Sequence, residues 1–129
     1  ICWNKTKFLG YHRLQEVYKY IAAADIGIAL LYPIKNYLES CPVKSFEYMA
    51  LAKAVIMSDF PYWKETYEDI AIFINPYKPK EIAEAIDYLA VNKNIRIDIG
   101  AKAKEKVEKY YSWENEEVKL LKLYNKILS

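Results

Sequence analysis

Short unbroken apolar runs alternate with amphipathic segments along this chain, and that alternation limits the folds it can adopt. The apolar runs lie at residues 26–31, 54–57 and 70–74, and such runs are typical of strands buried on both faces of a parallel sheet. The segments around them place apolar residues three and four positions apart, as amphipathic helices do; these segments are 14–22, 43–50 and 82–90. Strands alternating with helices predict right-handed crossovers and a parallel sheet with helices on both faces. The expected fold is a Rossmann-like α/β domain.

Three further elements are predicted with less regular patterns, and Pro42 supports the helix already expected at 43–50. Residues 7–9 form a short strand candidate that Gly10 closes, and Pro42 and Pro61 are each expected to start a helical segment. Ser112 can cap a last helix. The inner face of that helix is predicted to consist of Trp113, Glu117, Leu120, Leu121, Tyr124 and Leu128. Trp113 is expected to be a core anchor.

Size and charge narrow the class of protein. The chain of 129 residues fits one domain spanning 1–129, and it begins at Ile1, so we expect a piece of a larger two-domain protein. Nineteen basic against 17 acidic residues, without a basic stripe, give no support for nucleic-acid binding. No apolar run is long enough to span a membrane. Cys2 and Cys41 have no metal-ligand spacing, and together with the lack of a secretory leader they predict a reducing, cytoplasmic location.

The loop before Pro42 is the strongest candidate for a ligand site. In open parallel sheets, ligands bind beyond the carboxyl ends of the strands, where loops 10–13, 32–41 and 58–61 are expected. The middle loop is the longest, and it leads into a helix whose free amides and dipole would attract an anion such as a diphosphate. The alternative is that Ser40 caps those amides itself.

Two carboxylates frame this predicted anion site. Glu39 lies in the loop, and Glu47 lies on the helix at the edge of its buried stripe. A carboxylate there needs a partner, because burying an unpaired charge is costly. Sugar hydroxyls are one suitable partner, and an ion pair with Lys44 one turn earlier explains the residue equally well.

These residues resemble the signature of a known family. Residues 39–50 resemble the glutamate, seven residues, glutamate signature of family 4 glycosyltransferases, the group 1 retaining enzymes of GT-B fold. Residues 41–50 and 54–59 resemble the variant common in polysaccharide-building members. The resemblance continues in order over nearly the entire chain, at residues 8–10, 24–28, 75–86 and 111–113.

The resemblance implies the donor-binding half of an enzyme that moves a sugar from a nucleotide diphosphate sugar to a glycan or lipid-linked acceptor. Glu47 would hold the ribose hydroxyls, and Glu39 would lie beside the donor sugar as the candidate catalytic residue. The remaining substrate-binding residues would be Ser40, Cys41, Pro42, Val43 and Lys44, whose amides and charge receive the diphosphate. No metal or cofactor is implied.

The resemblance also concerns what lies outside this chain. The family's acceptor-binding N-terminal half and the first strands of the donor half are missing from it, so transfer by the chain alone is not expected. Peripheral membrane contact would be made through the full-length protein. Two alternatives remain, a non-catalytic nucleotide-binding or subunit-interaction module with a degenerate donor site, and another GT-B enzyme such as a sugar-nucleotide epimerase.

Several positions depart from the family pattern or allow more than one role. Many members have glycines where this chain has Ser40 to Pro42, and Ala52 replaces a glycine after the helix, at a cost of up to about 1 kcal/mol. Asp59 and Glu65 would contact ligand, or else serve as a cap and a local ion pair. His12 is expected to be a turn or surface histidine.

Overall fold

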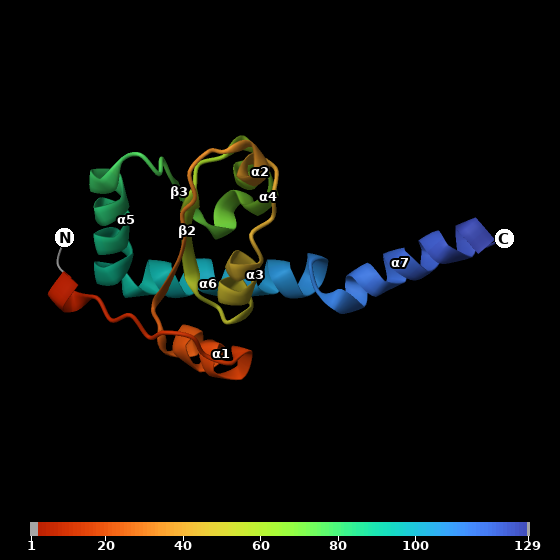
Figure 1. The fold of residues 1–129 in the computed structure, drawn as a ribbon, viewed down its shortest axis with the longest axis horizontal. Coiled ribbons are helices and arrows are strands. Elements are labelled where there is room, and N and C mark those ends of the chain that lie inside the picture. Colours follow the sequence, from red (N-terminus) through yellow and green to blue (C-terminus); the bar gives the residue numbers. More distant parts are fainter. Residues whose placement is uncertain (1–2, 129) are drawn as a thin grey trace.

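The centre of the fold is a parallel sheet of three strands, described by a computed structural model of residues 3–128 (Figure 1). The strand order is β1 (Ile26–Ala29), β2 (Ala54–Ser58) and β3 (Ile72–Ile74). Ile56 pairs with Ile28 on one side and with Ile72 on the other. All five residues of β2 are buried, which explains its unbroken apolar sequence, because a central strand is covered on both faces.

Two strands are shorter than their apolar runs suggested. β1 ends at Ala29, and the following residues begin the long loop. Ile70 belongs to the short 3-10 helix η2 (Glu68–Ile70), so β3 starts only at Ile72. Both differences concern the ends of elements, where hydrogen bonding rather than hydrophobicity decides the boundary.

Seven α-helices and one further 3-10 helix complete the described part of the chain. They are η1 (Trp3–Lys5), α1 (Leu14–Ala23), α2 (Lys35–Leu38), α3 (Val43–Ala50), α4 (Pro61–Tyr67), α5 (Pro79–Val91), α6 (Lys93–Tyr110) and α7 (Trp113–Leu128). The helices predicted at 14–22, 43–50 and 82–90 are confirmed. α3 begins one residue later than expected, with Pro42 at the N-cap position.

Helices cover both faces of the sheet, as the Rossmann-like prediction required. On one face, Met49 of α3 and Trp63 of α4 pack with Met57 of β2. On the opposite face, Leu89 of α5 packs with Ile56. Alternate residues of β2 therefore enter two separate cores, which fixes the register of the sheet.

The strand predicted at residues 7–9 is wrong. The segment has no regular secondary structure, and the side chain of Phe8 is 94% exposed. A short apolar segment becomes a strand only where a neighbouring strand completes its hydrogen bonds, and the described part of the sheet pairs none with it.

The predicted inner face of the last helix is also wrong. α7 has no buried residue, and it extends away from the sheet (Figure 1). Trp113, expected in the core, is 65% exposed. Ser112 does precede the helix, but its hydroxyl accepts a hydrogen bond from the side chain of Asn115. The prediction of a helix here is confirmed, but no described element packs over the apolar side of α7.

Candidate functional site

The start of α3 offers unoccupied backbone donors at the carboxyl end of the sheet. No side chain caps this helix. The hydroxyl of Ser40, the candidate cap, donates instead to the carbonyl of Tyr37 at 3.1 Å. Within residues 3–128, the amides of Val43 and Lys44 have no acceptor. Free amides at the positive end of a helix dipole form a site suited to an anion.

Helix α4 holds the loop that leads into α3. The indole Nε1 of Trp63 donates to the carbonyl of Ser40 at 2.5 Å. The hydroxyl of Ser45 donates to the carbonyl of Pro42 at 2.6 Å and lies 3.3 Å from the hydroxyl of Tyr67. Because Trp63 and Tyr67 are fully buried, residues 40–45 are held against a part of the protein that packing keeps rigid.

Sequence reasoning missed these two aromatic residues. Trp63 and Tyr67 are four positions apart, so both lie on one face of α4 directly after the central strand. That spacing in a segment following a crevice loop was the available signal. Burial raises the pKa of the Tyr67 hydroxyl well above its usual range, so this side chain stays neutral and keeps its contact with Ser45.

Glu47 lies half-buried on α3 beside a mostly apolar hollow of about 400 Å³. The hollow is lined from α1, α3 and α6, with Tyr18, Phe46 and Val107 among the lining residues. The ion pair with Lys44 that explained Glu47 equally well does not form, and in the described part of the chain its carboxylate has no hydrogen-bonding partner. Burial and then the Glu47 charge raise the pKa of neighbouring Tyr48.

The other predicted residues lie on the opposite side of the loop. Glu39 is exposed and forms the C-cap of the short helix α2, which lies beside α4 (Figure 1). Cys41 carries a free thiol whose Sγ lies 3.6 Å from the hydroxyl of Tyr62. Neither residue lines the hollow beside Glu47. Residues 40–45 thus gather at the start of α3, with Glu39 before them and Glu47 just over one helical turn beyond.

A buried serine joins the strand ends beneath this site. The Ser58 hydroxyl accepts a hydrogen bond from the Leu31 amide at 2.8 Å and donates to the Leu31 carbonyl at 2.7 Å. The two bonds connect the loop after β1 to the last residue of β2. They stabilise the edge of the sheet from which the loop 32–41 departs.

The structure shows the contacts of three polar residues, His12, Asp59 and Glu65, for which the sequence allows several roles. His12 lies in the turn before α1, within 2.8 Å of the Leu9 carbonyl and 3.3 Å of Glu16, as expected of a turn histidine. Asp59 does not cap α4, which has no side-chain cap. Glu65 has no ion pair among residues 3–128. Neither the helix cap considered for Asp59 nor the ion pair considered for Glu65 is therefore present.

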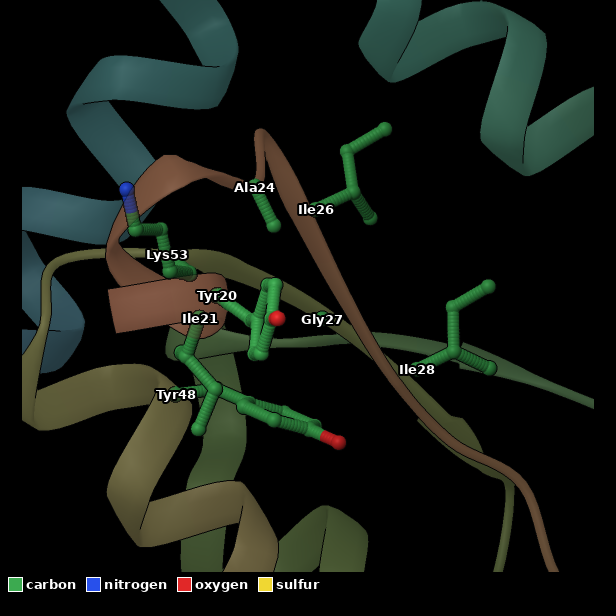
Figure 2. Close-up of a pocket in the computed structure, with 8 residues that line it drawn as sticks. All are labelled: Tyr20, Ile21, Ala24, Ile26, Gly27, Ile28, Tyr48 and Lys53. Carbon is green, nitrogen blue, oxygen red and sulfur yellow. The ribbon is translucent and has the colours of Figure 1, made fainter. Parts of the chain in front are cut away.

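A separate pocket of about 320 Å³ lies along β1 and holds none of the predicted site residues. Figure 2 shows the rings of Tyr20 and Tyr48 on the side of β1 where Gly27 lies, while Ile26 and Ile28 point to the other side. Since β1 is an edge strand of the described sheet, this pocket lies at the open side of the sheet and apart from the predicted site.

Comparison with known proteins gives one match. The family model described as glycosyl transferases group 1 matches residues 2–106, which include all seven predicted site residues. α7 lies beyond the matched segment. No curated protein and no solved structure matches the chain. Among residues 3–128, no helix combines the length and apolar character needed to cross a membrane.

Proposed function

Because the chain belongs to the group 1 glycosyltransferases, we propose that it forms the donor-binding half of an enzyme that uses a nucleotide diphosphate sugar. One observation carries the proposal, namely the uncapped start of α3 with its free amides at Val43 and Lys44. The two glutamates of the family-like signature lie on either side of these amides. A diphosphate bound there would satisfy backbone donors that otherwise bond only to water.

Different residues of the site bind different parts of the donor. Glu47 accepts the two ribose hydroxyls, since its carboxylate has two free oxygens beside an apolar hollow that can take part of the nucleoside. The α3 amides and the Lys44 ammonium bind the diphosphate and stabilise the negative charge that grows on it as the sugar leaves. Glu39 lies on the sugar side, where its charge stabilises the positive charge on the sugar carbon. Transfer proceeds with retention of configuration.

Two exposed features, the apolar side of α7 and the unpaired edge of β1, support a larger assembly. Most apolar residues of α7, among them Leu121 and Tyr124, are more than half exposed, and β1 leaves one edge of the described sheet unpaired. Surfaces of this kind usually mark sites of contact with another domain or chain. We therefore propose that a second, acceptor-binding domain completes the enzyme and that this chain alone does not transfer sugar. We also propose a cytoplasmic location, because the chain has only two cysteines, without metal-ligand spacing.

Calorimetric titration with uridine, guanosine and adenosine diphosphates tests the donor site. One nucleotide is expected to bind saturably, and Glu47→Ala is expected to weaken that binding about tenfold or more, because two charge-assisted hydrogen bonds are lost. Glu84→Ala, an exposed carboxylate on α5, is the matched control and should bind as the unaltered protein does. Equal affinities for the Glu47 variant and the control would refute the ribose assignment.

A sugar-transfer assay then distinguishes an active enzyme from a non-catalytic module with a degenerate donor site. After nucleotide binding is established, the protein is combined with a separately produced acceptor domain and supplied with the corresponding nucleotide sugar. Sugar transfer that Glu39→Gln abolishes supports the enzyme. Nucleotide binding without transfer under those conditions would favour the non-catalytic alternative.

A further inference from the structure

Another hollow, of about 700 Å³, is lined in part by the loop 32–41, here called the donor loop, and does not include Glu47. It lies between α4, the end of α6 and the start of α7. Cys41 of the loop 32–41 and Lys119 of α7 are both among its lining residues. We call this hollow the α4–α6 groove. It shares no lining residue with the hollow beside Glu47.

Helix α4 connects the groove to the donor loop. Its buried side carries Trp63, which donates to a carbonyl of that loop, and Tyr67, which contacts the start of α3. Its outer side carries Tyr62 and Glu65, which line the groove. The Cys41 thiol and the Tyr62 hydroxyl, 3.6 Å apart, lie where the donor loop and the groove meet. A ligand that fills the groove would therefore contact the loop 32–41 at Cys41.

Tyrosine rings supply the apolar surface of the groove. Tyr111 is fixed in place, because its hydroxyl donates to the Thr66 carbonyl at 3.4 Å and its ring lies 5.1 Å from that of Phe46. Tyr110 is 51% exposed and has the ammonium of Lys109 over its ring at 5.2 Å. Exposed rings of fixed orientation, each with a polar tip, bind ligands that combine apolar and hydroxyl surface.

The groove is lined by two carboxylates, Glu65 and Glu68, and two ammonium groups, Lys106 and Lys119, so its charges balance. Lys106 pairs with Glu68 at 3.1 Å, and Lys119 pairs with Glu116 at 2.5 Å. Glu65 has no charged partner among residues 3–128, which leaves its carboxylate oxygens as free hydrogen-bond acceptors. A strongly anionic ligand such as a nucleic acid gains nothing from such a surface, whereas a neutral ligand with many hydroxyls does.

We propose that the α4–α6 groove binds the acceptor as a neutral oligosaccharide. A sugar ring presents C–H groups on one face and hydroxyls around its edge, which match exposed tyrosine rings and a free carboxylate. The inference rests on the proposed function, because the acceptor's reacting end must reach the donor sugar, and the groove reaches the donor loop at Cys41. The groove thereby assigns part of acceptor recognition to the donor-binding half.

A binding panel tests this proposal. The probes are neutral hexasaccharides of glucose, galactose, mannose and N-acetylglucosamine in α and β linkage, with a sulfated hexasaccharide for comparison, observed by saturation-transfer NMR and then calorimetry. At least one neutral hexasaccharide is expected to bind saturably. Tyr110→Ala is expected to weaken that binding about fivefold, and Glu65→Gln should weaken it as well.

Control variants show whether a loss of oligosaccharide binding is specific to the groove. Tyr88→Ala removes a comparably exposed tyrosine of α5 that does not line the groove, and it should leave oligosaccharide binding unchanged. Nucleoside diphosphate binding by Tyr110→Ala should equal that of the unaltered protein, which shows that the variant is folded. If the nucleotides fail to bind while a neutral hexasaccharide binds at Tyr110, the donor assignment is wrong and the groove assignment stands.

Two results would overturn the proposal. One is that none of the neutral hexasaccharides binds, or that only the sulfated one does. The other is saturable oligosaccharide binding that Tyr110→Ala and Glu65→Gln leave unchanged.

Discussion

Replacing Gly100 by alanine should destabilise the protein, although alanine is the better helix former. Gly100 is buried in α6 where this helix crosses the turn between α3 and β2. A Cβ atom at this position would lie 2.2 Å from the carbonyl oxygen of Ala52 and 2.8 Å from its carbonyl carbon. Ordinary contact begins near 3.4 Å, so α6 and the turn would have to separate by about 1 Å.

The expected loss of unfolding free energy is about 2 kcal/mol. Overpacking a tight site costs about 1–3 kcal/mol, and the upper end applies here because the obstacle is backbone, which cannot rotate away. Alanine returns about 1 kcal/mol through its greater helix propensity. Urea unfolding of Gly100→Ala beside the unaltered protein, followed by circular dichroism, measures the difference.

Gly27→Ala is the matched control. A Cβ atom at Gly27 would meet the ring of Tyr48 at 2.4 Å, and a half-buried side chain can move where a backbone cannot. The double variant Gly27→Ala, Tyr48→Ala should therefore lose less stability than its two single variants together. A Gly100→Ala protein as stable as the unaltered one would refute the close approach of α6 to the turn.

Three further predictions follow from single residues. Ala52 has φ of 54°, so Ala52→Gly should raise the unfolding free energy by about 1 kcal/mol in the same urea assay, and a decrease would contradict the left-handed turn. Ser58→Ala removes both bonds to Leu31 and should cost about 2 kcal/mol; an unchanged urea midpoint would count against them. Burial raises the pKa of Tyr67, so above pH 10 the unfolded state loses a proton that the native state keeps, and stability falls as pH rises. Tyr67→Phe should make this alkaline fall less steep, and an equal slope would show that Tyr67 is not its source.

Local patterns in the sequence were sufficient to predict the sheet and most helices. The run at 54–57 became the central strand β2, because a continuous apolar segment needs cover on both faces. The start of α3 was located to within one residue, since Pro42 fixes a backbone angle that suits this position. These features depend on residues that are close together in the sequence, so local patterns are enough to predict them.

Features that depend on distant partners were not predictable in this way. The bond from Trp63 to the Ser40 carbonyl joins residues 23 positions apart, and no periodicity reveals it. The apolar side of α7 was assigned to the core because its period is helical, but periodicity does not say which element will cover a face. The separation of Cys41 from Glu47 into different hollows likewise results from how α4 and α6 pack around α3.

An amide NMR titration of isotopically labelled protein with the nucleoside diphosphate that binds in calorimetry tests the central claim most directly. The account predicts that the amide signals of Val43 and Lys44 shift and saturate at the calorimetric affinity, while that of Gly27 on the β1 edge stays in place. Saturable shifts confined to the neighbourhood of Gly27, with Val43 and Lys44 unmoved, would contradict an anion site at the start of α3.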